Sequence, residues 1–276
     1  MRRHELSDAE WEFVQPLLPE SLRGRKRLDD RKVLNGIVWK FRTGTAWRDV
    51  PERYGPWATL HTRFRRWAAD GTFDRMLRAA QAKADAAGDI EWLVSVDSTI
   101  VRAHQHAAGA RKGGSETRPL GWSRGGLTSK IHLACDGRGR PLAFVVTGGN
   151  INDCTRFITV MEAIRVPRLG PGRPRIRPDH VLGDKSYSSR AIRTWLRRHG
   201  IAHTIPERAD QVRNRVRRGG HGGRPPAFDR EAYKHRNVVE RCFNRLKQWR
   251  GIATRYNKTA QSYEAAVALA SLLMWA

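Results

Sequence analysis

Hydrophobic residues recur at helical spacing through the first ninety residues. The clearest stripe consists of Val33, Leu34, Ile37, Val38 and Phe41. This spacing predicts an amphipathic helix, and Gly44 is a suitable residue to end it. Before it, Ser7 and Glu10 have the spacing of a capping box. Further helices are predicted over 56–71 and 72–88, so the pattern indicates a small all-helical domain over residues 1–90.

From residue 91 the hydrophobic period changes to that of strands. Strands are predicted over 91–99, 127–136 and 141–149, and the turn at 136–140 joins the last two as a hairpin. A helix over 151–164, a strand over 179–187, a helix over 188–200 and a strand over 201–207 follow. After a basic loop, residues 233–251 form a last helix. We therefore expect an α/β domain over 91–276 with a mixed five-stranded sheet and flanking helices.

Two aspartates are predicted to end neighbouring strands of this sheet. Asp97 ends the first strand and Asp184 ends the fourth. The helical crossover before the fourth strand lets it lie parallel beside the first strand. Ligand sites form outside the carboxyl ends of parallel strands, so we expect these two carboxylates to meet.

The last helix carries a third acid in a basic surrounding. At 100° per residue, Tyr233, Arg236, Glu240 and Lys247 fall within about 60° of one another. This stripe runs along the border of the apolar face, whereas a solvated salt-bridge face would lie opposite the core. The position favours a Glu240 that points toward a site, although a surface salt bridge is the simpler alternative. Two aspartates and a glutamate are hard oxygen ligands suited to Mg²⁺ or Mn²⁺.

The charge balance indicates a polyanionic partner. The chain of 276 residues has 52 Lys and Arg against 27 Asp and Glu, which gives a net charge of +25. Neutralising phosphates releases counterions, so nucleic acid is the first candidate and an anionic membrane surface the rival. No apolar run is long enough to span a bilayer, and no apolar stretch follows the Met-Arg-Arg start. The three cysteines lack zinc-site spacing, so we expect reduced thiols in a cytoplasmic protein.

The second and third predicted helices suit a helix-turn-helix. The third is basic and carries Arg63, Arg65 and Arg66, which could contact DNA. Amphipathic helix pairs are common, however, so DNA recognition and plain packing stay open for this region.

Several polar and aromatic residues near the predicted site have no single assignment. His104 and His106 lack a third ligand at a useful spacing, which favours a polar loop over a metal site. For His104, His106, Lys185 and Tyr187, contact with DNA and a structural role are equally open. For Trp122, packing is favoured over stacking on a base.

At these residues the sequence resembles a known family. The spacing Tyr-x2-Arg-x3-Glu-x6-Lys from Tyr233 to Lys247 is similar to the signature of the DDE transposases of bacterial insertion sequences. "VDST" and "GDKSY" resemble that family's two aspartate motifs. "LSDAEWEFVQPLLP", "VLNGIVWKFRTGTAWRDVPERYG" and "GGLTSKIHLACDGRGRPLAFVVTGGN" resemble the branch around insertion sequence five. The resemblance covers almost the whole chain.

The resemblance implies a fold, a reaction and roles for individual residues. It implies a ribonuclease H-like core in which Asp97, Asp184 and Glu240 are catalytic and bind two Mg²⁺ or Mn²⁺ ions. It also implies that three residues contact the transposon-end DNA backbone: Tyr233, Arg236 and Lys247. The expected reaction is DNA cleavage followed by strand transfer into target DNA, in the bacterial cytoplasm, by a homodimer that bridges two ends. The segment at 207–230 is a short basic insertion in place of a large β-rich one.

Two other functions fit parts of the same pattern. A nuclease of the same fold would only hydrolyse DNA and would give no joined product from a pre-cut end. A non-catalytic DNA-binding regulator would leave the three carboxylates scattered, and Mg²⁺ would have no effect on it.

Overall fold

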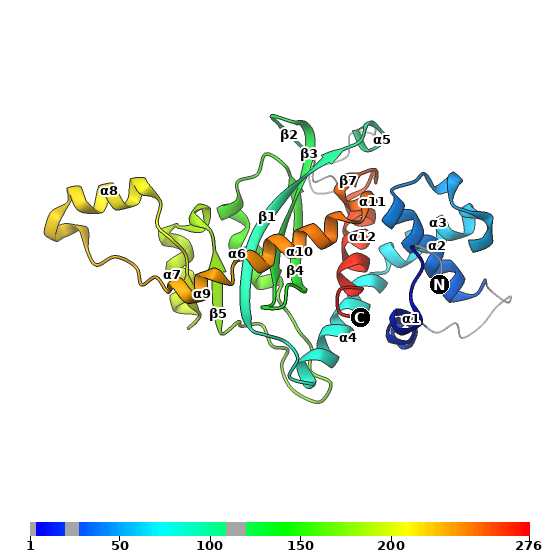
Figure 1. Ribbon diagram of the computed structural model, residues 1–276, viewed down its shortest axis with the longest axis horizontal. Helices are drawn as coiled ribbons and strands as arrows, with labels where there is room; N and C mark the ends of the chain where they lie inside the picture. The colour runs from blue at the N-terminus through cyan, green and yellow to red at the C-terminus, as the bar shows by residue number, and fades with distance from the viewer. Residues whose placement is uncertain (1–3, 20–27, 109–119) are drawn as a thin grey trace.

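The computed structural model describes residues 4–19, 28–108 and 120–276, with an all-helical N-terminal region beside a mixed sheet (Figure 1). The helices of this region are α1 (Asp8–Val14), η1 (Gln15–Leu17), α2 (Asp30–Thr43), η2 (Trp47–Asp49), η3 (Glu52–Tyr54), α3 (Trp57–Ala69) and α4 (Thr72–Ala86). The predicted capping box begins α1, because Ser7 Oγ accepts from the Glu10 amide at 3.0 Å and the Glu10 carboxylate accepts from the Ser7 amide. Gly44 ends α2 at a φ of 74°, as predicted. The expected helical region is confirmed.

The sheet has seven strands in the described part of the chain. They are β1 (Leu93–Ala103), β2 (Gly121–Ser123), β3 (Gly126–Cys135), β4 (Pro141–Gly148), β5 (His180–Gly183), β6 (Ala202–Thr204) and β7 (Thr254–Arg255). Strands β3 and β4 form the predicted antiparallel hairpin. Its turn includes Gly139 at a φ of 78°, a backbone conformation that side-chain-bearing residues rarely adopt.

The long strand β1 lies at the centre and sets the topology. It pairs antiparallel with β3 from Ser95↔Cys135 to Arg102↔Thr128, and parallel with β5 from Leu93↔His180 to Val96↔Gly183. Strand β6 extends the parallel half, and the short β2 and β7 pair with β3 and β1. The five main strands therefore run in the order β4-β3-β1-β5-β6, which is the expected ribonuclease H-like arrangement. The predicted parallel pairing of the first and fourth strands is confirmed.

Helices pack on this sheet and join it to the N-terminal region. They are η5 (Asp153–Arg156), α6 (Phe157–Ala163), α7 (Arg190–Arg198), α9 (Arg230–Lys234), α10 (Asn237–Lys247), α11 (Arg250–Ala253) and α12 (Ala260–Leu272). Helix α10 packs on β1 and β3, and Figure 1 shows it crossing β1. Helix α12 is almost entirely buried and packs on α3, α4 and β4. One continuous apolar cluster consequently extends from Leu6 to Trp275. Even α12 falls short of a bilayer crossing, and so does every other helix in the described ranges.

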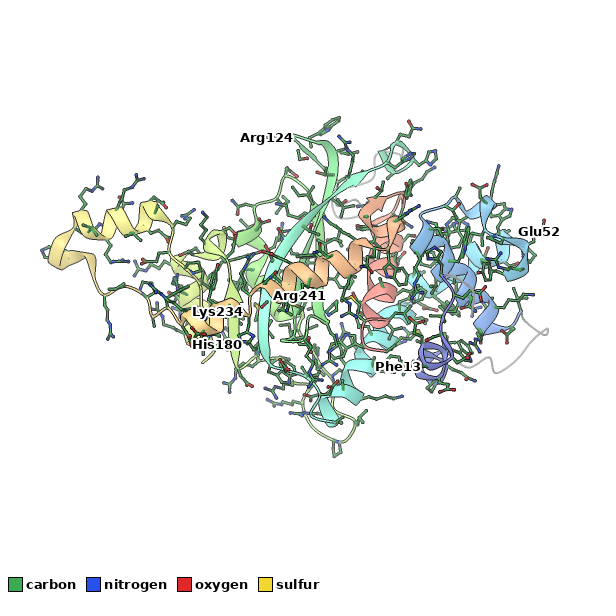
Figure 2. The ribbon with its side chains drawn as sticks, in the orientation of Figure 1. Phe13, Glu52, Arg124, His180, Lys234 and Arg241 are labelled. Atoms are coloured by element: carbon green, nitrogen blue, oxygen red, sulfur yellow. The ribbon has the colours of Figure 1, made fainter. Side chains whose placement is uncertain are left out.

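Two predicted boundaries are wrong. Strand β1 continues past Asp97 to Ala103, because the β-branched run after the aspartate keeps pairing with β3. The last helix is interrupted between α9 and α10, where the Val238 and Val239 amides bond three residues back to His235 and Arg236. Figure 2 labels Lys234 and Arg241, one on each side of this tightened turn.

The sequence pattern also missed α12, which follows the helix expected to be the last, and two short helices. Helix α8 (Ala209–Arg217), with η7 (Gly219–Gly222) after it, lies in the basic insertion at 207–230 and projects from the sheet (Figure 1). Helix α5 (Gln105–Ala108) holds His106 where a polar loop was expected. The structure leaves Trp122 77% exposed on β2, so the expected packing role of this residue is wrong.

Candidate active site

Asp97 lies where β1 stops pairing with β5 but continues to pair with β3. Its neighbour Val96 is the last β1 residue paired with β5, while Asp97 itself still pairs with Leu133 of β3. The Ser98 amide donates to Asp97 Oδ1 at 2.8 Å. The side chain is 19% exposed, so the carboxylate is only partly desolvated.

Asp184 follows β5 directly and begins the 3-10 turn η6 (Lys185–Tyr187). Its Oδ1 accepts from the Ser186 amide at 2.9 Å and also from the Ser186 hydroxyl. These bonds fix the carboxylate at the carboxyl end of β5, as the sequence predicted. Lys185 beside it is exposed, whereas Tyr187 is 1% exposed and therefore cannot contact DNA in this structure.

The electrostatics of Asp97 show that several acids converge there. Burial raises the pKa of Asp97, while the Ser98 amide and the charge of Arg236 oppose this shift. The charges of Asp184 and Asp153 raise the pKa of Asp97 further. Asp184 and Asp153 thus repel the Asp97 carboxylate within a partly desolvated site. A bound cation would relieve this repulsion.

Arg236 joins Asp97 to Glu240. Its Nη2 donates to Asp97 Oδ2 at 2.6 Å and its Nη1 donates to Glu240 Oε1 at 2.9 Å. Burial alone would lower the pKa of Arg236, but the charges of Asp97, Tyr233, Glu240 and Asp184 outweigh it and raise that pKa. Arg236 is 18% exposed and Glu240 is 52% exposed. The guanidinium therefore occupies the centre of the acidic site.

The oxygen atoms of the acids are suitable ligands for a hard divalent cation, but Arg236 lies between two of these acids. Asp97, Asp184 and Glu240 offer only carboxylate oxygens, the donors that Mg²⁺ and Mn²⁺ prefer. Within the described ranges, however, no three His, Cys, Asp or Glu side chains are grouped so that they could hold a metal ion. The Arg236 guanidinium lies between Asp97 and Glu240 instead. A shared metal site for the three acids stays a prediction.

Asp153 is a further acid at this site, and the sequence interpretation missed it. Its Oδ1 accepts from Ser98 Oγ at 2.7 Å and from Lys130 Nζ at 2.8 Å. Lys130 comes from β3 and is 8% exposed. Burial lowers the pKa of the adjacent His132 to about 4, and the charge of Asp153 opposes that shift. The position of Asp153 just after β4, close to the strand that carries Asp97, was the available signal.

The other predicted contact residues are spread over a wider surface. Tyr233 packs against Phe228, and burial raises the pKa of its hydroxyl. Lys247 lies three helical turns beyond the break, where its Nζ donates to the Ile100 carbonyl at 3.3 Å. Arg63 is paired with Asp30 at 2.9 Å.

Arg65 and Arg66 of α3 are exposed and lie apart from the acids, along a pocket between α3 and the region around α5. The structure therefore joins Arg236 to Asp97 and Glu240, places Asp184 within reach of their charges, and leaves the α3 arginines elsewhere. The cysteines are free thiols, as predicted.

Most of the chain is similar to known families and proteins. Residues 89–275 match the family model described as "Transposase DDE domain", and residues 6–77 match "Putative transposase of IS4/5 family". The chain is 30% identical over 209 residues to "Putative transposase for insertion sequence element IS402" of Burkholderia cepacia, covering 76% of this chain and 89% of that protein. It is 28% identical over 149 residues to "Putative transposase for insertion sequence element IS6501" of Brucella ovis, covering 54% of this chain and 98% of that protein.

Among solved structures, the "Mos1 transposase paired-end complex with left transposon end" is similar at 12% identity and covers 82% of this chain and 80% of that chain. Its TM-score of 0.27 is too low to add to the topology described above. The family assignment rests on the matched models and on the central strand with its aspartate. The chain belongs to the DDE transposases of IS4/5-family insertion sequences.

Proposed function

We propose that this transposase binds the ends of its insertion sequence and catalyses divalent-metal-dependent DNA cleavage and strand transfer. The observation that carries the proposal is that Arg236 binds both Asp97 and Glu240, while the charge of Asp184 acts on the same guanidinium, from three elements far apart in the sequence. The net charge of +25 supports a DNA partner. We assign DNA binding to the helical residues 1–90 and catalysis to residues 91–276, acting as a homodimer on two ends.

In this proposal Asp97, Asp184 and Glu240 hold two Mg²⁺ or Mn²⁺ ions. Such ions, when bound, lower the pKa of water and neutralise charge on a phosphodiester. Asp97 and Asp184 are fixed by the Ser98 and Ser186 amides, so their oxygens are positioned before DNA arrives. Glu240 is half exposed and is held only by Arg236 among the bonds described for its side chain. We assign to Glu240 the last step of assembly, when Arg236 turns from the acids to a DNA phosphate.

The remaining signature residues lie where they can hold the DNA backbone. Tyr233 precedes Arg236 by one turn, and Lys247 lies at the far end of α10. We propose that Tyr233, Arg236 and Lys247 contact backbone phosphates, with the exposed Lys185 beside Asp184 as a further contact. We also propose that Arg63, Arg65 and Arg66 of α3 contact DNA, at a separate surface of the N-terminal region.

The decisive experiment uses the full chain, a labelled duplex carrying the element end, and Mg²⁺. The Asp97→Asn variant should bind the duplex as the wild type does and should lose cleavage by at least about 10³-fold, because the charge that holds the cation is gone. Glu12→Gln, an exposed acid on α1, is the matched control and should cleave normally. Cleavage by Asp97→Asn at the wild-type rate would overturn the assignment. A pre-cut end then separates a transposase from a hydrolytic nuclease, since only the transposase joins it to target DNA.

A further inference from the structure

A basic pocket lies between the N-terminal helices and the C-terminal part of the chain, away from the three acids. It has a volume of about 1010 Å³ and is lined by α2, α3, the residues between β1 and α5, and the segment from β7 into α12. Its basic lining residues are Lys40, His61, Arg65, Arg66, His104, His106 and Lys258, and Tyr256 lines it as well. No Asp or Glu of the described residues lines it. The pocket therefore concentrates positive charge without an internal counter-ion.

Lys40 is the unusual member of this set. It is 3% exposed, and within the described ranges its ammonium has no carboxylate and no hydrogen-bond acceptor. The ammonium lies over the rings of Phe41 at 4.3 Å and Trp47 at 5.5 Å, and faces Tyr256 at 5.9 Å. Ring faces offset part of the desolvation cost of a cation, but they leave its three donors unused.

Lys40 shares the pocket with other basic groups. Burial lowers the pKa of Lys40 to about 8, so the ammonium stays mostly protonated at neutral pH. Burial lowers the pKa of His61 too, and the charges of Arg65 and Lys40 add to that shift. An anion in the pocket would satisfy the donors of Lys40 and relieve this repulsion. A plain structural role for Lys40 offers no such gain, since an apolar residue would pack there at less cost.

We infer that this pocket binds a backbone phosphate of the element-end duplex, at a site separate from the carboxylates. The inference rests on the proposed function for the identity of the DNA. His104 follows β1, seven residues after Asp97, and at about 3.3 Å per residue the pocket lies about 23 Å along the strand. In B-form DNA, with about 3.4 Å per base pair, that span corresponds to about seven base pairs. The pocket would hold the duplex in register while its end lies at Asp97.

The test measures DNA binding in EDTA, so catalysis does not enter. Lys40→Met should lower affinity for the element-end duplex about tenfold and reduce the slope of log K against log salt by about 1. Lys83→Met, an exposed lysine on α4, is the matched control and should change neither quantity. Lys258→Gln, an exposed residue on the opposite wall, should weaken binding in the same direction and guards against a Lys40 variant that fails to fold.

Two further arms identify the ligand. Neutral methylphosphonate linkages scanned along the duplex should weaken wild-type binding most at a phosphate about seven base pairs from the end, and should have no such effect on Lys40→Met. Inorganic phosphate should raise the melting temperature of the wild type and not that of Lys40→Met. A phosphate-induced shift with unchanged DNA binding in Lys40→Met would mean a free-phosphate site and would overturn the inference.

The inference and the proposed function fail separately. Wild-type affinity and salt slope in both Lys40→Met and Lys258→Gln would overturn the phosphate site, and loss of cleavage in Asp97→Asn would still support the proposed chemistry. Conversely, weakened binding in the pocket variants together with full cleavage by Asp97→Asn would leave the phosphate site standing and remove the catalytic assignment.

Discussion

Arg236 donates to Asp97 across 2.6 Å, although the two residues are 139 positions apart in the chain. The same guanidinium donates to Glu240 one turn further along its helix. A cation of the protein thus lies between two of the three acids to which we assign metal binding.

Replacing Arg236 by Met should reveal the repulsion that it balances. In EDTA we expect a loss of about 2 kcal/mol in the free energy of unfolding, below the range for fully buried pairs because both partners are about a fifth exposed. Mg²⁺ should then stabilise the variant more than the wild type, because the acids no longer hold a guanidinium. Arg241→Met on the same helix is the control. Equal gains from Mg²⁺ in wild type and Arg236→Met would contradict this role.

Stability should depend on pH through His132. Burial lowers the pKa of this imidazole to about 4, whereas in the unfolded chain it has its usual value of about 6.5. Between pH 4 and 6.5, His132 is therefore protonated in the unfolded chain and mostly neutral in the folded one. The contribution of neutral His132 to the free energy of unfolding is full above pH 6.5 and is lost as the pH falls toward 4. We expect the free energy of unfolding of His132→Gln, measured by chemical denaturation, to fall by about 3 kcal/mol less than that of the wild type between pH 6.5 and 4. The same pH dependence in both proteins would rule out His132 as the source.

The pair formed by Lys130 and Asp153 should behave as a coupled unit. Asp153→Asn leaves a nearly buried ammonium without its partner at 2.8 Å, and Lys130→Met leaves the carboxylate near the charge of Asp97. A double-mutant cycle on unfolding free energies should give a coupling of about 2 kcal/mol, with the double variant more stable than the sum of the single changes predicts. Additive single effects would show that the contact carries no net energy.

Much of the sheet could be predicted because its signals are local. The strand-ending position of Asp184 and the hairpin at 136–140 follow from short patterns, and the handedness of crossovers then places β5 beside β1. The end of β1 could not be found in this way. Asp97 and Ser98 interrupt the apolar run, yet pairing with β3 carries the strand on to Ala103, and such pairing depends on residues far away in the sequence.

The sequence pattern singled out Arg236 with the three acids, but it missed Asp153 and its partner Lys130. The spacing of the signature residues places Arg236 and Glu240 on one helical face, but only the tertiary structure shows that Arg236 reaches Asp97. Lys40 gave a usable signal, because it shares a helical face with Val33 and Ile37, which are buried. Its lack of a counter-ion depends on α3, α5 and the segment after β7, which no local pattern brings together.

The central claim is that Glu240 belongs to the catalytic site although it is half exposed and forms an ordinary-looking ion pair within one helix. The most direct measurement is strand transfer of a pre-cut element end into target DNA with Mg²⁺ by wild type, Glu240→Gln and the surface control Glu12→Gln. We expect joined product from wild type and Glu12→Gln, and a loss of at least about 10³-fold with Glu240→Gln, with DNA binding retained. Joined product from Glu240→Gln at the wild-type level would contradict the account and reduce Glu240 to a surface salt bridge.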